Sequence, residues 1–276
     1  MSERRCLVMG IVNRTPDSFY DGGRMGLDES VEHALSLVEQ GADMLDIGAV
    51  KAGPGEGVEM NEELDRLLPL VEAVVRATTV PISVETARSQ VADRALAAGA
   101  SIVNDVTGLA DGDLAGVCAD RGASLVLMHH GGQLRGRPRH PHYEDVVADV
   151  IATLEALAAS AQRAGVADER LIVDPGLDFG KNTFHSLELM RRLEELTALK
   201  WPVLVAPSRK DMVGETLALA PDQRLEGTLA LVALSVLRGA AIVRVHDVAQ
   251  TVHVVRMTEA VEGRRVPAAP LRGLWD

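Results

Sequence analysis

A carboxylate at the end of an apolar run is the first feature of this chain that could do chemistry. Residues 171–173 read Leu-Ile-Val, the continuous apolar character of a strand that is covered on both faces, and Asp174 follows directly. Pro175 and Gly176 end such a strand, because proline has no N–H to donate and glycine accepts turn dihedrals. The stretch predicts a buried strand that carries Asp174 to a rim, then a polar turn and a helix capped at Asn182.

Polar side chains follow seven further apolar runs in the same way. These residues are Asn13, Asp46, Glu85, Asn104, His129, the trio Ser208, Arg209 and Lys210, and the pair Arg244 and His246. Because the carboxyl ends of parallel strands meet at one rim, we expect these side chains to lie near Asp174. A charge such as that of Asp174 or Arg244 is costly beside β-branched residues, so each needs a partner, and a bound ligand is the simplest one.

Eight units of a strand followed by a helix must position these side chains. Four of the helical patterns end in Gly-Ala, which is typical of a helix that stops at a C′ glycine; the glycines are Gly41, Gly99, Gly122 and Gly239. Eight such units in 276 residues predict one domain over residues 1–276, a (β/α)8 TIM barrel. The alternative is an open doubly wound sheet, and it is disfavoured because no Gly-x-Gly-x-x-Gly follows the first strand.

The composition indicates which partners the chain does not have. Hydrophobic residues make up 47% of it and aromatic residues only 3%, so aliphatic side chains must fill the core. The net charge of −12 argues against nucleic acid, which needs a basic surface. No apolar run reaches the length of a membrane span and no signal region is recognisable, so we expect a cytoplasmic protein. Two cysteines, Cys6 and Cys118, indicate neither a disulfide nor a zinc site.

Basic residues gather in a few loops of this acidic chain. Three of the four lysines, Lys51, Lys181 and Lys210, follow strand ends, which favours a role at the working rim of a barrel. The loop at residues 129–142 holds four of the eight histidines together with three arginines. We interpret this loop as a mobile lid that attracts anions. The alternative, a metal site, lacks both helical i,i+4 spacing and a nearby cysteine.

The first long loop carries the most specific signal. Residues 10–23 read GIVNRTPDSFYDGG, a longer pattern than turn chemistry alone explains. Further motifs follow in order: SVET at 83–86, IVNDV at 102–106, DPGLDFGK at 174–181, SRK at 208–210 and VRVHD at 243–247. With these motifs, and over essentially its full length, the chain resembles the dihydropteroate synthase family.

The resemblance implies a (β/α)8 barrel that joins 6-hydroxymethyl-7,8-dihydropterin diphosphate to the aryl amine 4-aminobenzoate and releases diphosphate. It implies Mg²⁺ as the cofactor, with Asn13 at the matching metal position, and it suggests a homodimer formed through barrel helices. The residues that match the family's substrate-binding positions are Glu85, Asn104, Asp174, Ser208, Lys210, Arg244 and His246. Those that match its catalytic positions are Asp174, Lys210, Arg244 and His246.

These residue types suit that reaction. A pterin ring has an edge of hydrogen-bond donors and acceptors, and Asp174 can accept from the donors while Asn104 and Lys210 complement the rest. A planar guanidinium such as that of Arg244 can stack on the ring, as the ammonium of a lysine cannot. Departure of diphosphate develops charge that Mg²⁺ and fixed cations stabilise, so no covalent nucleophile is required.

The chain also departs from the family pattern. After the second strand the family typically has Ser-Thr-Arg-Pro-Gly, and here the sequence reads Lys51-Ala52-Gly53-Pro54-Gly55, without the threonine and arginine that help to hold 4-aminobenzoate. Lys51 can face a carboxylate but lacks the bidentate fork of arginine. Further departures are Glu85 for an aspartate, Asp178 for a glycine and Arg14 for an apolar residue.

Three functions therefore stay open at this point. The first is a dihydropteroate synthase, or a relative with a different amine acceptor. The second is a pterin-binding paralogue that does not condense 4-aminobenzoate and has a binding or regulatory role. The third is a methyltransferase that uses methyltetrahydrofolate and shares the pterin-binding barrel, but the first loop, at residues 10–23, argues against it.

Overall fold

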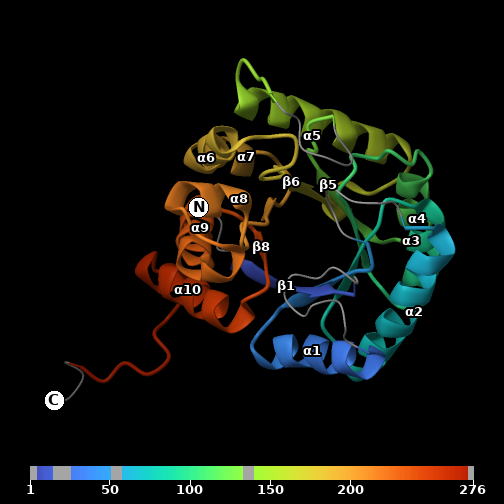
Figure 1. Ribbon diagram of the computed structural model, residues 1–276, viewed down its shortest axis with the longest axis horizontal. Helices are drawn as coiled ribbons and strands as arrows, with labels where there is room; N and C mark the ends of the chain where they lie inside the picture. The colour runs from blue at the N-terminus through green and yellow to red at the C-terminus, as the bar shows by residue number, and fades with distance from the viewer. Residues whose placement is uncertain (1–4, 15–25, 51–57, 133–139, 273–276) are drawn as a thin grey trace.

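The chain folds into a barrel of parallel strands inside a ring of helices (Figure 1). The computed structural model describes residues 5–14, 26–50, 58–132 and 140–272. Its strands are β1 (Leu7–Asn13), β2 (Met44–Gly48), β3 (Ile82–Glu85), β4 (Ile102–Asp105), β5 (Ser124–Met128), β6 (Leu171–Asp174), β7 (Leu204–Val205) and β8 (Ile242–Val245). The expected pattern, in which an apolar run ends in a polar residue, is thus the observed strand pattern.

Helices lie between consecutive strands and cover the outside of the barrel. The α-helices are α1 (Leu27–Glu39), α2 (Met60–Ala77), α3 (Ser89–Ala97), α4 (Leu114–Asp120), α5 (Val146–Arg163), α6 (Thr183–Arg191), α7 (Leu193–Thr197), α8 (Asp211–Leu217), α9 (Leu225–Leu237) and α10 (Val248–Val261). Two 3₁₀ turns, η1 (Asp168–Arg170) and η2 (Pro221–Gln223), precede β6 and α9. Among the described helices, none combines the length and the apolar character needed to cross a membrane.

The strand order confirms the predicted (β/α)8 barrel. The sheet runs β6-β5-β4-β3-β2-β1-β8-β7, and all its pairings are parallel. A single bridge between Val173 and Val203, with the Val173 amide donating to the Pro202 carbonyl at 3.0 Å, joins β6 to the start of β7. The barrel is therefore nearly closed, and the carboxyl ends of all eight strands lie at one rim.

The four Gly-Ala pairs end helices as predicted. Gly41, Gly99, Gly122 and Gly239 all have positive φ, at 101°, 108°, 61° and 84°. A side chain at such a φ is strained, which is why glycine stands where each helix must turn back toward its strand.

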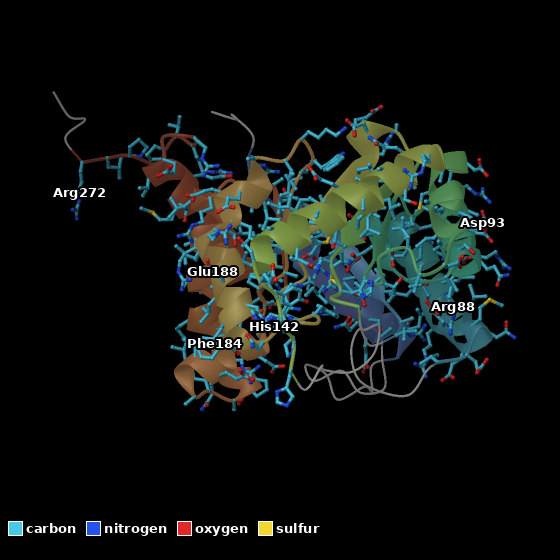
Figure 2. The ribbon with its side chains drawn as sticks, turned by 90° about the horizontal axis from the view of Figure 1, so that it is seen from above. Arg88, Asp93, His142, Phe184, Glu188 and Arg272 are labelled. Carbon is cyan, nitrogen blue, oxygen red and sulfur yellow. The ribbon has the colours of Figure 1, made fainter. Side chains whose placement is uncertain are left out.

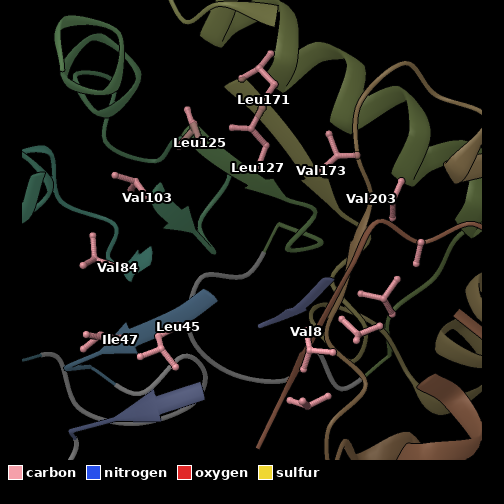
Figure 3. Packing of buried hydrophobic residues seen from close by; sticks show 14 of the residues in the cluster. Val8, Leu45, Ile47, Val84, Val103, Leu125, Leu127, Leu171, Val173 and Val203 are labelled. Carbon is pink, nitrogen blue, oxygen red and sulfur yellow. The ribbon is translucent and has the colours of Figure 1, made fainter. Parts of the chain in front are cut away.

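The larger part of the core lies between the strands and the helices. Charged side chains such as Arg88, Asp93 and Glu188 lie at the outer edge of the helix layer (Figure 2). Figure 3 shows the opposite face of that layer, where branched strand residues point outward from the barrel and pack against the helices. They include Val8, Leu45, Val84, Val103, Leu125, Leu171 and Val203, all buried. The low aromatic content is thus met by valine, leucine and alanine, as expected.

The interior of the barrel has two layers of different character. One is a cluster of buried apolar side chains, here called the apolar layer, formed by Met9, Met44, Ile102, Val126, Leu204 and Ile242. Successive side chains on a strand point to opposite faces, so the residue two positions further along points inward again. On several strands that next inward residue is polar. These side chains, here called the polar layer, are Asp46, Ser83, Glu85, Asn104, Asp174 and Arg244.

Candidate active site

The centre of the polar layer is an arginine held by two buried carboxylates. Arg244 on β8 donates from Nε to Asp46 Oδ2 at 2.6 Å and from Nη2 to Glu85 Oε2 at 2.6 Å. Asp46 is fully buried on β2, and Glu85 is nearly so at the end of β3. Three strands are therefore tied together across the barrel mouth, with the guanidinium between them.

Asp46 is also the acceptor for two neutral donors. Ser83 donates to its Oδ1 at 2.6 Å, and Asn104 Nδ2 donates to its Oδ2 at 3.0 Å. We had placed Asp46 at a strand end but had not predicted it as a site residue. Its signal was present in the sequence, since it lies two residues after the inward-facing Met44 and before a glycine.

These contacts and burial shift the pKa values of Glu85 and Arg244. Burial raises the pKa of Glu85 to about 7, although Arg244 acts to lower it. Burial also acts to lower the pKa of Arg244, but Asp46 and Glu85 outweigh it and raise that pKa, so the guanidinium stays charged. Arginine at such a position is a fixed cation.

Asn104 keeps one unused hydrogen-bonding atom in this layer. Its amide nitrogen is engaged by Asp46, but its Oδ1 is buried and has no hydrogen-bond partner among the described residues. A buried acceptor without a donor costs free energy, of the order of 1 to 3 kcal/mol, unless a ligand supplies the donor.

Asp174 lies at the end of β6, as predicted. Its Oδ1 accepts a hydrogen bond from the Gly176 amide at 2.7 Å, and only 5% of the residue is exposed. Burial raises its pKa, against the Gly176 hydrogen bond and the nearby Lys210. Gly176 has a φ of 64°, and a Cβ there would lie 2.1 Å from the His129 carbonyl oxygen. Glycine is thus required where this turn crosses the end of β5.

Lys210 supplies a second cation. Its Nζ lies 4.5 Å from the centre of the Phe179 ring, and in the described part of the chain it makes no hydrogen bond or ion pair. Burial lowers its pKa, while Asp178 and Asp174 act to raise it. The lysine is therefore placed beside the carboxylates but remains available to a ligand.

Ser208 and His246 form a hydrogen-bonded pair next to this lysine. The His246 amide donates to Ser208 Oγ at 3.2 Å, and that oxygen lies 2.9 Å from His246 Nδ1. A hydroxyl that accepts from the amide can donate its hydrogen to Nδ1, an arrangement in which the ring proton lies on Nε2. Burial and the charge of Arg244 lower the pKa of His246 to about 4, so its imidazole is neutral at pH 7.

Lys181 lies in the loop after β6, as predicted, but its ammonium is bound within the chain. Its Nζ lies 2.8 Å from His129 Nδ1 and donates to the carbonyls of Gly176 and Phe179, both at 2.9 Å. The ammonium joins the loop after β5 to the loop after β6. Asp247, the residue before α10, makes no side-chain cap and instead pairs with Arg209 at 2.8 Å.

Several expected features lie outside the described residues. They include most of the first loop, the second loop from Lys51 and the three arginines of the loop 129–142.

Of that last loop, His129 is buried and its Nε2 lies 2.9 Å from Asp149. A cavity of about 320 Å³ lies beside it, away from the polar layer, and is lined by His129, His130, His142, Tyr143 and Asp149 among others. Within the described residues no three of the side chains His, Cys, Asp and Glu are grouped to hold a metal.

Asn13 fits a supporting role toward Mg²⁺. It ends β1, and its Oδ1 lies against Gly48 at the end of β2, 3.3 Å from where a Cβ on that glycine would be. A single neutral oxygen is a poor cage for a dication. Mg²⁺ in proteins is commonly held by one or two protein oxygens, by phosphate oxygens of the substrate and by water, and Asn13 suits that arrangement.

The polar layer can thus bind a flat, buried ligand through one edge and one face. The polar layer offers two acceptors, the Asp174 carboxylate and Asn104 Oδ1, and one cation, Arg244. Lys210 beside the layer supplies a second cation. Except for Lys210 and for Ser208 with His246, which lie in loops after β7 and β8, these groups stand on strand ends and are fixed by the barrel.

Comparison with known proteins agrees with this geometry. The model of the family described as "Pterin binding enzyme" matches residues 9–246. A Mycobacterium leprae protein named "Inactive dihydropteroate synthase 2" is 47% identical over 98% of this chain and 95% of its own length. The Bacillus subtilis dihydropteroate synthase is 41% identical over 94% and 90%. The solved structure of Xanthomonas albilineans dihydropteroate synthase with 4-aminobenzoic acid superposes with a TM-score of 0.88, at 41% identity, over 98% of this chain and 96% of that one.

Proposed function

The chain belongs to the family of pterin-binding enzymes that includes dihydropteroate synthase, and from this premise we propose that it binds 6-hydroxymethyl-7,8-dihydropterin diphosphate in the polar layer. We further propose that it transfers the pterin group to the amine of 4-aminobenzoate and releases diphosphate. The proposal rests mainly on two buried acceptors beside the cations Lys210 and Arg244. Asn104 Oδ1 has no hydrogen-bond partner among the described residues, and Asp174 accepts from the Gly176 amide through one of its two oxygens.

The ring edge of a pterin matches these acceptors. Its amino group and ring N–H donate, and the Asp174 carboxylate and Asn104 Oδ1 accept, which satisfies the buried oxygen that the ligand-free chain leaves without a donor. Asp46 and Glu85 hold the Arg244 guanidinium from two sides, and a planar group fixed in this way can stack on the ring.

We propose that the diphosphate end of the substrate binds beside the loops after β7 and β8, which carry Lys210, Ser208 and His246. The Lys210 side chain makes no hydrogen bond or ion pair among the described residues, and the hydrogen-bonded pair of Ser208 and His246 lies beside it, with the Nε2–H of His246 as its donor toward the diphosphate. Bound Mg²⁺ would neutralise the leaving diphosphate, and Asn13 would contribute one oxygen to it. The chain's own part is to fix cations and donors where negative charge develops as the C–O bond breaks.

A second candidate function is pterin binding without condensation. The M. leprae relative is named inactive, and the sequence has Ala52 and Gly53 where the family typically has the threonine and arginine that help to hold 4-aminobenzoate. The residues of the polar layer that would bind the pterin are present in either case. The two candidates therefore differ in turnover and agree in pterin binding.

Equilibrium dialysis against the pterin diphosphate, with and without Mg²⁺, tests pterin binding. We expect saturable binding by the wild type and about tenfold or more weaker binding by Asp174→Asn, because an amide presents its own donor to a donor edge and leaves buried groups poorly paired, at a cost of about 1 to 3 kcal/mol. Equal affinity of the two proteins would remove Asp174 from the pocket.

Steady-state condensation with 4-aminobenzoate separates the two candidates. Turnover by the wild type supports the transferase, and pterin binding without turnover supports the paralogue. In the latter case, Ala52→Thr with Gly53→Arg is expected to raise kcat/KM, since each restored hydrogen bond to a charged group contributes about 1.5 to 3 kcal/mol. An unchanged kcat/KM in the double variant would show that the loss of activity has another cause.

We also propose that the chain forms a homodimer through α9 and α10. The α9 sequence, LEGTLALVALSVL, is apolar almost all round, and Leu234 and Leu237 are 37% and 47% exposed. On the adjacent α10, Met257 and Val261 are 65% and 69% exposed. A helix that is apolar on all sides needs a second partner beyond its own barrel. Light scattering is expected to show a dimer in the wild type and a monomer in Leu234→Glu with Leu237→Glu; a monomeric wild type would contradict the proposal.

Two further expectations stay predictions. We propose a cytoplasmic location, in keeping with a substrate that is a small, charged metabolite. We also expect small molecules as the partners of this site, since the net charge of −12 opposes nucleic acid.

A further inference from the structure

Asp178, in the turn after β6, has a backbone conformation that its residue type does not favour. Its φ is 67°, and the described residues contain only four positions other than glycine with positive φ. The dihydropteroate synthase pattern has a glycine here, for which this φ carries no penalty. An L-residue in this region costs on the order of 1 kcal/mol, although aspartate tolerates it better than most. Contacts of the side chain must offset that cost.

Those contacts tie the turn to two helices. The Asp178 amide donates to Ser186 Oγ on α6 at 3.0 Å, and that hydroxyl donates back to Asp178 Oδ1 at 3.0 Å. Asp178 Oδ2 accepts from the Met212 amide, in the first turn of α8, at 3.2 Å. A glycine at position 178 keeps only the first of these three bonds.

The hydrogen bond between Asp178 and Met212 lies close to Phe179 and Lys210 along the chain. Met212 lies two residues after Lys210, which immediately precedes α8, and Phe179 follows Asp178 directly. The Phe179 ring and the Lys210 ammonium are the pair that lie 4.5 Å apart. The hydrogen bond from Met212 to Asp178 therefore fixes the ring and the lysine relative to each other.

Charges from four directions act on Lys210. Asp178 in the turn, Asp174 on β6 and Glu85 on β3 favour its charged form, while Arg244 on β8 and burial oppose it. Arg244 already neutralises Glu85 through a direct ion pair, and Asp174 accepts from the Gly176 amide. Among these carboxylates Asp178 acts most strongly on Lys210, and it also acts on Lys181.

We propose that Asp178 is a positioning residue for Lys210. Through its hydrogen bonds with Met212 and Ser186 it holds the lysine over the Phe179 ring. The inference rests on the proposed function only in making Lys210 a contact of the pterin diphosphate. Asp178 itself touches no reacting atom.

Two substitutions separate the charge of Asp178 from its hydrogen bonds. Asp178→Asn tolerates positive φ, removes the charge and retains an oxygen for the Met212 amide, while its NH2 group replaces the oxygen that accepts from Ser186. Asp178→Gly removes the charge and both side-chain hydrogen bonds while relieving the backbone. Asp222→Asn is the matched control, because Asp222 is an exposed carboxylate in η2 and its loss changes the net charge equally.

Carbon-13 NMR of the chain with labelled lysine Cε atoms reads the charge directly. The chain has only four lysines, so Lys210→Arg assigns the Lys210 signal by its disappearance. We expect that signal to titrate at a lower pH in Asp178→Asn and in Asp178→Gly than in the wild type, and at the wild-type pH in Asp222→Asn. An unchanged titration midpoint in both Asp178 variants would mean that Asp178 does not act on the surroundings of Lys210 and would contradict the positioning role.

Hydrogen exchange at the Met212 amide reads the positioning. We expect faster exchange in Asp178→Gly than in Asp178→Asn, and about tenfold weaker binding of the pterin diphosphate in Asp178→Gly. Wild-type exchange and affinity in Asp178→Gly would overturn the positioning part. If the wild type binds no pterin diphosphate, the proposed function fails, while the titration and the exchange rates still decide the role of Asp178.

Discussion

The apolar layer and the polar layer meet on β2, β4 and β8, where their residues lie two positions apart but make different contacts. Met44, Ile102 and Ile242 are packed inside the barrel against other apolar side chains. Asp46, Asn104 and Arg244 follow them at spacing two and form a hydrogen-bonded network. On these strands the residue that packs in the core and the residue that faces the candidate site are thus only two positions apart.

The difference shows how a barrel separates stability from function. In the apolar layer every contact is made within the chain, so a substitution there acts on the free energy of unfolding. In the polar layer Arg244 is paired with Asp46 and Glu85, but Asn104 Oδ1 has no hydrogen-bond partner among the described residues, and neither has the neighbouring Lys210 side chain. These are the atoms that the proposed ligand would engage.

The largest effect is expected from a charge in the apolar layer. Met9 is fully buried on β1, and Met9→Asp would place a carboxylate there with no cation beside it. Such a charge costs several kcal/mol, comparable with a typical total stability of about 5 to 15 kcal/mol. We expect no cooperative thermal unfolding transition by circular dichroism.

Met9→Leu is the control, since a swap of similar volume costs less than about 1.5 kcal/mol. A cooperative transition in Met9→Asp near the wild-type temperature would mean that the apolar layer is not a dry core.

A smaller effect is expected when the central cation of the polar layer is removed. Arg244→Met leaves the fully buried Asp46 and its neighbour Glu85 without their counter-charge. Breaking a buried ion pair at one partner costs about 3 to 5 kcal/mol, which lowers the urea midpoint but leaves a folded barrel.

Adding Asp46→Asn and Glu85→Gln to Arg244→Met removes the uncompensated charges and is expected to recover part of the loss. If the triple variant is no more stable than Arg244→Met, the ion pairs are not the cause.

The smallest effect concerns pH and lies beside the two layers. Burial and the charge of Lys181 lower the pKa of His129 to about 4, from a usual value near 6.5. Between these values the unfolded chain binds a proton at this position and the folded chain does not, so stability falls as the pH falls through this window.

His129→Gln removes this contribution, on the order of 1 to 3 kcal/mol, and should show a smaller loss of unfolding free energy between pH 7 and pH 4.5 in urea titrations. The exposed His253, changed to Gln, is the control and should keep the wild-type pH dependence. Identical pH dependence in His129→Gln and the wild type would contradict the buried, neutral state of His129.

Much of the fold could be predicted because its signals are local. The strand that ends in Asp174, the cap at Asn182 and the glycines that end four helices follow from residue types at short spacing, and the structure has them. The shortest strand is β7, which is formed by Leu204–Val205 only. On the side of β6 it is joined only by the bridge between Val173 and Val203, which closes the barrel. No local sequence pattern predicts that pairing.

The site was harder to predict, because the direction and partners of a side chain depend on the tertiary structure. Loop position favoured a role for Lys181 at the rim, but could not show that its ammonium lies against His129 and donates to two carbonyls. Asp46 was missed, since nothing in the sequence tells that an arginine 198 residues away will lie against it. The spacing of two from Met44 was the available signal, and it indicates direction without naming a partner.

The two layers can be tested most directly on β4, where Ile102 and Asn104 point into the barrel two residues apart. The melting temperatures of the wild type, Ile102→Val and Asn104→Leu are measured with and without the pterin diphosphate and Mg²⁺. We predict that Ile102→Val lowers both temperatures, by about 0.5 to 1.5 kcal/mol of stability, and keeps the increase caused by the ligand, whereas Asn104→Leu loses most of that increase. An equal ligand-induced increase in all three proteins, or its equal loss in both variants, would contradict the separation of a structural layer from a pterin-binding one.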